Sequence, residues 1–349
     1  MHRLCAVLLL TLSALARPVA ALEFKDGLDA YRRQDWSTAI KVFTLLAERG
    51  DARSQFALAM MYDRGEGLAN DDRKALEWYT KSAQAGYAKA QLNLGFMYER
   101  GEGVAKDGKK SLHWFREAGT QGNPEALARL TELAGSGDSE AQFLVGTMHA
   151  TGRGVEKNLE AARKWLAKAA KAGHVKSQYN LAVLLEEAGE EEQARQWYKK
   201  AAAQGHVKAA YNLGLLYLDE DPATAARYLE QAANQGHATA QYQLALLCEE
   251  GRGVSADRGK ARKLFEAAAR AGHAPAQVNL GSRYARGENA GAPPDLVRAY
   301  AWFTIAAQSE EAARKNLELI ESRLQPQQID AARALLPRLL AGSTVADDS

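Results

Sequence analysis

The chain has 349 residues, of which 46% are hydrophobic and 25% are charged, a composition typical of a folded protein. Its 45 basic residues nearly balance its 43 acidic residues. Nucleic-acid binding requires a concentrated basic face, so this balance argues against a nucleic-acid partner.

Residues 1–21 have the pattern of a secretory signal peptide. A basic start at Arg3 precedes the apolar run LCAVLLLTLSALA, and small residues end the segment at Ala21. The apolar run is too short to span a bilayer comfortably. We expect cleavage after Ala21, a periplasmic or secreted location, and no membrane insertion of the mature chain. Cys248 is then the one remaining cysteine, which excludes an intramolecular disulfide.

The chain repeats itself from about residue 51 to residue 309. Four segments superimpose without gaps: GEGLANDDRKALEWY from 65, GEGVAKDGKKSLHWF from 101, GRGVEKNLEAARKWL from 152 and GRGVSADRGKARKLF from 251. One position, aromatic in most units, recurs along the chain: Trp78, Trp114, Trp165, Trp197, Tyr228, Leu264 and Trp302. Successive members of this series are 36, 51, 32, 31, 36 and 38 residues apart. A period near 36 is typical of stacked helical hairpins. The sequence therefore predicts an all-α fold, an α/α solenoid of about seven units.

The stretch GEGVAKDGKK at 101–110 resembles a phosphate-binding loop, but it lacks the full pattern. Lys110 stands where a magnesium-binding hydroxyl is needed, and the Gly108-Lys109 pair does not recur in the other units. The preceding residues have helical spacing, whereas a phosphate loop follows a strand. We interpret the stretch as an interhelical loop and expect no nucleotide or other cofactor.

Each unit is expected to consist of a first helix (helix A), a loop and a second helix (helix B). Glycines of the Gly-x-Gly loop should end helix A with positive φ, and a polar residue should cap helix B. We expect five tryptophans of helix B to form the structural core: Trp78, Trp114, Trp165, Trp197 and Trp302.

Several segments depart from this pattern. Units beginning near 175 and 207 lack the Gly-x-Gly loop, and residues 124–137 form an extra helix without a partner. Residues 22–50 should form a capping hairpin, residues 310–340 capping helices, and residues 341–349 a disordered tail.

The pattern resembles the Sel1-like repeat family, a relative of the tetratricopeptide repeats. The matching residues of one unit are Ala90, Leu94-Gly95, Tyr98, Gly101-x-Gly103-Val104, Asp107, Trp114-Phe115 and Gly122. The segment YRRQDWSTAIKVF near the start resembles a degenerate tetratricopeptide hairpin. The resemblance implies a solenoid in which helix A lines a concave binding surface.

The candidate chemical groups do not form a catalytic pattern. His174, His206, His237 and His273 follow the terminal glycine of four units, one repeat apart, which does not suit convergence on one metal ion. We interpret them as helix-end packing residues. The acidic cluster from Glu186 to Glu192 is interpreted as a solvated loop. We therefore expect no metal site, no catalytic residue and no enzyme activity.

A row of amides occupies one position of helix A: Asn93, Asn180, Asn212, Gln243 and Asn279. An amide offers both donors and an acceptor, so such a row can bind the backbone of an extended peptide. The alternative is that each amide fixes the neighbouring helix. Substitution of Asn180 and Asn212 would separate the two interpretations.

These features together predict a periplasmic scaffold or adaptor that binds a protein or peptide partner without catalysis. One alternative is a structural subunit of a cell-envelope complex for polysaccharide export or secretion. Another is an envelope hydrolase that processes penicillin-type compounds or peptidoglycan. The last alternative is disfavoured because the family members that it resembles carry a disulfide in each repeat, and this chain has no such cysteines.

Overall fold

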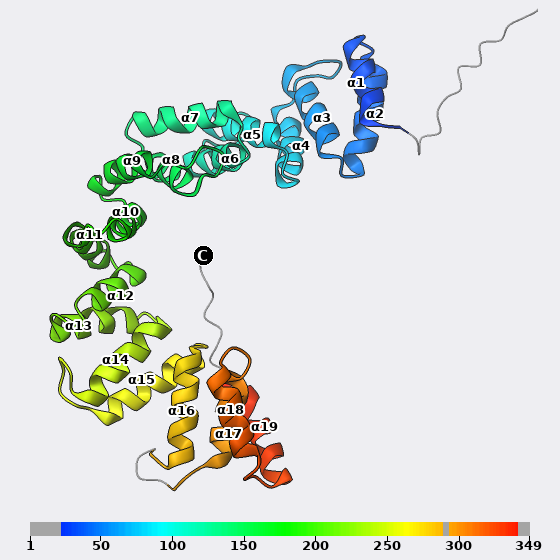
Figure 1. Cartoon of the computed structure of the whole chain (residues 1–349). Helices are drawn as coiled ribbons and strands as arrows, with labels where there is room; N and C mark the ends of the chain where they lie inside the picture. The colour runs from blue at the N-terminus through cyan, green and yellow to red at the C-terminus, as the bar shows by residue number, and fades with distance from the viewer. Residues whose placement is uncertain (1–21, 289–292, 341–349) are drawn as a thin grey trace, which may run out of the picture. The chain divides into compact units, whose positions relative to one another are not determined.

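The structure is a computed structural model that describes residues 22–288 and 293–340. The predicted signal peptide, 1–21, and the predicted tail, 341–349, lie outside the described residues. Within those residues the chain forms nineteen helices and no strand, so the predicted all-α class is confirmed (Figure 1). Among the described helices, none combines the length and the apolar character that a membrane span requires.

The helices follow one another with short connections. The first nine are α1 Phe24–Arg32, α2 Trp36–Glu48, α3 Ala52–Arg64, α4 Asp72–Gln84, α5 Ala88–Arg100, α6 Gly108–Thr120, α7 Pro124–Gly135, α8 Ser139–Thr151 and α9 Leu159–Lys171. The next ten are α10 Val175–Glu187, α11 Glu191–Ala203, α12 Val207–Leu216, α13 Pro222–Ala233, α14 Ala238–Glu250, α15 Arg258–Arg270, α16 Ala274–Arg286, α17 Leu296–Ala306, α18 Glu311–Glu321 and α19 Pro326–Leu340.

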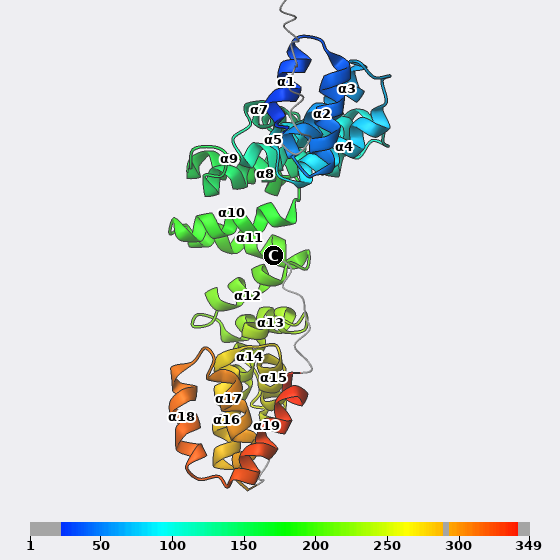
Figure 2. The same cartoon turned by 90° about the vertical axis from the view of Figure 1, so that its right-hand side faces the viewer.

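Consecutive helices pack against each other as hairpins. The A–B pairs are α3 with α4, α5 with α6, α10 with α11, α12 with α13, α14 with α15 and α16 with α17. Four helices B also pack against the next helix A: α4 against α5, α11 against α12, α13 against α14 and α15 against α16. The contacts divide the chain into two compact units, Met1–Lys168 and Ala169–Ser349. In the second unit α17 contacts both α18 and α19, which close the stack (Figure 2).

The loops end and begin helices as the sequence predicts. Gly101 ends α5 in the left-handed region with φ of 80°, and Gly103 follows with φ of 66°. Asp107 then caps α6 by accepting a hydrogen bond of 3.0 Å from the backbone N–H of Lys110. A side chain at either glycine would be strained, so the repeated loop requires this residue type.

The core of each hairpin forms where a small residue of helix A meets a large one of helix B. A methyl group added to Gly95 of α5 would lie 2.6 Å from the ring of Phe115 of α6, and Gly281 of α16 faces Phe303 of α17 in the same way. Both rings are fully buried. The absence of a side chain at these glycines lets the two helices approach closely.

The five predicted core tryptophans differ in burial, and Trp78, Trp114 and Trp165 pack against the edge of the hydrophobic core clusters. Trp78, Trp114, Trp165 and Trp197 are only partly buried, whereas Trp302 is buried. The residue after each of the four is the buried one: Tyr79, Phe115, Leu166 and Tyr198. One residue turns a helix by about 100°, so the predicted register is displaced by one position from the face that meets helix A. The ammonium groups of Lys81, Lys168 and Lys200 lie over three of the tryptophan rings, at 4.0, 4.3 and 4.1 Å from the centroid.

Candidate interaction surfaces

Two amides of the predicted row are bonded to buried tyrosines of the preceding helix B. Asn93 Nδ2 donates to the Tyr79 hydroxyl over 2.9 Å, and Asn212 Nδ2 donates to the Tyr198 hydroxyl over 3.1 Å. These hydrogen bonds join α5 to α4 and α12 to α11. At these two positions the structure supports the interpretation that the amide fixes the neighbouring helix.

A carboxylate completes each of these two networks. The Tyr79 hydroxyl donates to Asp63 over 3.1 Å, and the Tyr198 hydroxyl donates to Glu186 over 2.6 Å. Burial, reinforced by the neighbouring carboxylate, raises the pKa of both tyrosines far above its usual value. Both phenols therefore remain neutral and act as structural donors, and Glu186 of the acidic cluster has a structural role.

The remaining three amides have different surroundings. Asn279 accepts a hydrogen bond of 2.5 Å from Arg283 Nε, and Arg283 also forms an ion pair with Glu249. For Asn180 and Gln243, the described part of the structure contains no side-chain hydrogen bond, and both are partly exposed. These two amides are therefore the members of the row that can bind a partner without breaking an internal contact.

Tyrosines beside these amides lie against the histidines that the sequence places at helix starts; the rings of Tyr179 and His206 are stacked, and those of the other two pairs are tilted. The ring centroids lie 4.5 Å apart for Tyr179 and His206, 4.6 Å for Tyr211 and His237, and 4.8 Å for Tyr242 and His273. All six side chains are partly exposed. We call these three pairs, together with Asn180, Asn212 and Gln243, the second-unit strip. It offers flat aromatic surface and amide groups at regular intervals.

Each histidine of the four also caps a helix. Nδ1 of His206 accepts a hydrogen bond of 3.2 Å from the N–H of Ala209, and His174, His237 and His273 accept equivalent bonds. An imidazole can accept at Nδ1 only while that nitrogen carries no proton. Burial lowers the pKa of His206, His237 and His273, with a further contribution from Lys208 for the first two. His206, His237 and His273 therefore act as neutral N-caps, which is more specific than the helix-end packing that the sequence predicts.

A second recurring amide, which the sequence analysis did not single out, has a structural role. Six glutamines of helix A donate from Nε2 to the carbonyl oxygen eight residues earlier, at the end of the preceding helix, over 2.9–3.2 Å: Gln55, Gln91, Gln142, Gln178, Gln241 and Gln277. Each of these carbonyl oxygens also accepts a hydrogen bond from the backbone N–H of the glycine three residues later, so the glutamine supplies a second hydrogen bond at the helix end. The repeated Ala-Gln or Ser-Gln dipeptide is the sequence signal that could have identified this role.

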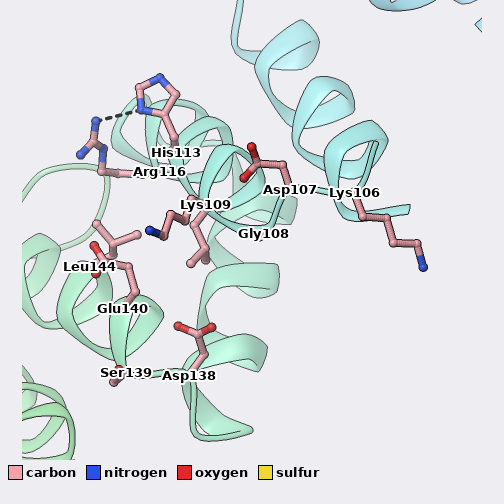
Figure 3. A pocket seen from close by; sticks show the side chains of 11 residues that line it. Lys106, Asp107, Gly108, Lys109, His113, Arg116, Asp138, Ser139, Glu140 and Leu144 are labelled. Carbon is pink, nitrogen blue, oxygen red and sulfur yellow. Dashed lines mark hydrogen bonds between the residues drawn. The ribbon is translucent and has the colours of Figure 1, made fainter. Parts of the chain in front are cut away.

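A pocket of about 850 Å³ lies between the first turns of α6 and α8 (Figure 3). Its apolar surface comes from Leu112 and Leu144, both buried. Lys109 extends into the space between the two helices, and Asp138 points into it from the start of α8. Leu144 occupies the amide position of α8, so this position faces a pocket here and has no amide.

Comparison with known proteins identifies the repeat. The family model for the Sel1 repeat matches seven segments, 52–87, 88–123, 139–174, 175–206, 207–237, 238–273 and 274–310. The chain belongs to the Sel1 repeat family. Helix α7 lies in the segment that no repeat matches, between the second and third Sel1 repeats.

Solved structures of Sel1-like proteins share the fold. The chain is 30% identical to c5321, a protective antigen of uropathogenic Escherichia coli with this fold, with a TM-score of 0.56 over 89% of this chain and 75% of that one. It is 26% identical to a Sel1 repeat protein from Oxalobacter formigenes, with a TM-score of 0.52 over 91% of this chain and 90% of that one. The predicted α/α solenoid class is thereby confirmed.

Two curated relatives match a shorter part of the chain. They are exopolysaccharide production negative regulators, one from Rhizobium meliloti (strain 1021) at 27% identity and one from Rhizobium leguminosarum bv. viciae at 29%. Each match covers 152 residues, which is 43% of this chain and 56% of the relative. The chain thus spans just over half the length of these relatives.

Proposed function

We propose that this Sel1 repeat chain is an exported, non-catalytic scaffold that binds a partner protein or peptide on the second-unit strip. Sel1 repeats generally mediate protein–protein interaction. The observation that carries the proposal is that Asn180 and Gln243 lie beside partly exposed tyrosines, and that their side chains make no hydrogen bond within the described residues. Rigid hairpins would present these groups with little loss of conformational entropy on binding.

The strip suits an extended segment of a partner. Tyr179, Tyr211 and Tyr242 recur at nearly equal steps along the chain, each followed by an amide. Aromatic rings supply contact area, and the amides can pair with backbone N–H and C=O groups. The charge of Lys208 acts on both His206 and His237, so a basic group lies close to two of the tyrosine–histidine pairs. We infer that the bound segment carries acidic residues.

The exported location rests on the signal-peptide pattern of residues 1–21. Immunoblotting of cell fractions from a strain that produces the tagged chain would test it. The expected result is a processed band in the periplasmic or secreted fraction. An unprocessed band confined to the cytoplasm would overturn the proposed location.

A photo-crosslinker placed at single sites would test the proposed surface. Lys208 of α12 is exposed beside the strip, and Lys200 of α11 is exposed on a helix B. We expect a crosslinker at Lys208 to capture a partner from the envelope fraction, whereas one at Lys200 should not. Equal capture at both sites, or capture at Lys200 alone, would contradict the proposal.

A second candidate is a permanent subunit of an envelope complex that acts in polysaccharide export. The observation that favours it is the similarity to the two exopolysaccharide production negative regulators. Co-purification at low and at high salt would distinguish the two. A permanent subunit should stay with its complex at high salt, whereas an adaptor held by exposed polar groups should dissociate.

A further inference from the structure

The first turn of α2, α4 and α13 is covered by the Gly-x-Gly loop that ends the next helix A. The second glycine of the loop lies so close to the first turn that a side chain there would overlap it: Gly67 against Trp36 of α2, Gly103 against Asp72 of α4, and Gly253 against Pro222 of α13. These three contacts show which structure fits this surface. It is a helix end with a left-handed Gly-x-Gly turn.

The start of α6 lacks this cover. Gly108 stands in α6 where Asp72 stands in α4, at the first position after the capping aspartate, and a methyl group added to Gly108 would meet nothing within 4 Å. Instead of a loop, α7 is followed by the tight turn Ser136–Asp138, which leads directly into α8. The pocket between α6 and α8 lies at this uncovered surface.

The loop that follows α8 cannot cover this surface. Because α7 reverses the chain direction once more, the end of α8 lies beside the end of α6, and Gly154 lies against Gly119 and Thr120. One additional helix has therefore moved the loop from the first turn of α6 to its last turn. The uncovered first turn is a direct consequence of the extra helix.

A side chain fills the equivalent surface where another short connection occurs. In α11, Arg195 occupies the register of Leu112 in α6, two residues before the tryptophan. It is only 12% exposed, forms an ion pair of 2.6 Å with Glu220, and its guanidinium lies 4.9 Å from the centre of the Tyr217 ring. Leu112 is too short to fill the space in this way, which leaves the pocket at α6 open.

We propose that the pocket between α6 and α8 binds the end of a helix from another protein that terminates in a Gly-x-Gly turn followed by Val or Leu. The turn would lie on Gly108 and Lys109, as Gly103 lies on Asp72 and Arg73. The apolar residue of the turn would contact Leu112 and Leu144. This site lies in the first compact unit, so it is independent of the second-unit strip.

A stapled helical peptide with the sequence of residues 91–107, QLNLGFMYERGEGVAKD, would test this site on the full mature chain. The staple removes the cost of ordering the helix, and fluorescence anisotropy of the labelled peptide measures binding. We expect a Kd of about 1 mM or tighter. A matched control peptide has valine in place of the second glycine. Valine disfavours the positive φ that the turn requires. We expect this control to bind at least about tenfold more weakly, a difference of about 1.4 kcal/mol in binding free energy.

Variants of the chain locate the site. Gly108→Trp should fill the pocket and abolish peptide binding, whereas Gly135→Trp should not, because Gly135 is exposed with open space on α7. Unchanged circular dichroism of both variants confirms that they fold. The proposal is overturned if the glycine peptide does not bind, if the valine peptide binds equally well, or if Gly108→Trp binds like the unmodified chain.

Discussion

The side chain of Asn93 in α5 is joined to that of Tyr79 in α4 by a hydrogen bond of 2.9 Å. Tyr79 is fully buried, and its hydroxyl donates to Asp63 at the end of α3. Three successive helices are thus joined through one phenol. The same arrangement recurs in the second unit through Tyr198, Glu186 and Asn212.

Asn93→Ala and Asn212→Ala should each destabilise the chain by about 1–2 kcal/mol, because each removes a hydrogen bond to a buried hydroxyl. Gln243→Ala should change the free energy of unfolding by no more than about 0.5 kcal/mol, because Gln243 has no such bond. Urea unfolding followed by circular dichroism measures both effects. In a double-mutant cycle of Asn93→Ala with Tyr79→Phe, the two effects on the free energy of unfolding should be coupled. Strictly additive effects would contradict a stabilising hydrogen bond between these two side chains.

Replacement of Ala85 or Ala271 by Gln should stabilise the chain. The glutamines at the ends of α6 and α11, Gln121 and Gln204, donate to Gln91 and Gln178 over 2.7 and 2.8 Å. Ala85 and Ala271 occupy the same position at the ends of α4 and α15, and buried oxygens of Gln55 and Gln241 have no partner.

Each new glutamine should add about 0.5–1.5 kcal/mol to the free energy of unfolding. Gln121→Ala is the reverse control and should lower stability by a similar amount. Thermal unfolding monitored by circular dichroism gives both values. A loss of stability in Ala85→Gln and Ala271→Gln would count against this arrangement.

Stability should fall as the pH drops from about 7.5 to about 5.5. The pKa of His206, His237 and His273 is lowered in the folded chain, chiefly by burial, so the unfolded chain binds more protons in this range. The stability that these neutral histidines contribute is fully present above the ordinary histidine pKa and is lost as the pH falls below it. Protonation of Nδ1 would also remove the acceptor that caps each helix.

The triple variant His206→Asn, His237→Asn, His273→Asn is the control for this titration. Asn123 already caps α7 with its side-chain oxygen, so asparagine can retain the cap without titrating. Its melting temperature should depend less on pH than that of the unmodified chain. Identical pH profiles for the two proteins would exclude the histidines as the cause.

Phe115→Ala should lower the free energy of unfolding by about 3–5 kcal/mol, because the ring is fully buried against Gly95. Trp114→Ala should cost less, because Trp114 is only partly buried. The tryptophan register alone would predict the opposite order. Chemical denaturation gives the free energy of unfolding of both variants. A larger loss of stability in Trp114→Ala than in Phe115→Ala would show that the tryptophan is the core residue.

The sequence predicts the fold class because the helical hairpin recurs seven times, four times with the same Gly-x-Gly turn, and each recurrence supports the others. It does not predict which of two adjacent aromatic residues enters the core, since Trp114 and Phe115 are both large and apolar and differ only in helix face. That choice depends on Gly95, which lies on another helix and admits the Phe115 ring.

The candidate site was predictable only in part. The amide row is visible in the sequence, but its division into bonded and unbonded members depends on what the previous helix B presents. Asn93 and Asn212 face hydroxyls because Tyr79 and Tyr198 occupy the buried position, whereas Gln243 and Asn279 follow helices with Leu229 and Phe265 there. The sequence predicts the extra helix that leads to the pocket at α6. It does not predict which surface that helix leaves uncovered, because this depends on how the helices pack in three dimensions.

The most direct test of the proposed scaffold is partner capture by the double variant Asn180→Ala, Gln243→Ala, with the melting temperature measured in parallel. Neither amide makes an internal hydrogen bond within the described residues, so we expect unchanged melting and at least a tenfold loss of captured partner, about 1.4 kcal/mol. Asn212→Ala serves as the structural comparison and should lower the melting temperature. Undiminished capture by the double variant, or a large drop in its melting temperature, would contradict the assignment of the second-unit strip as the binding surface.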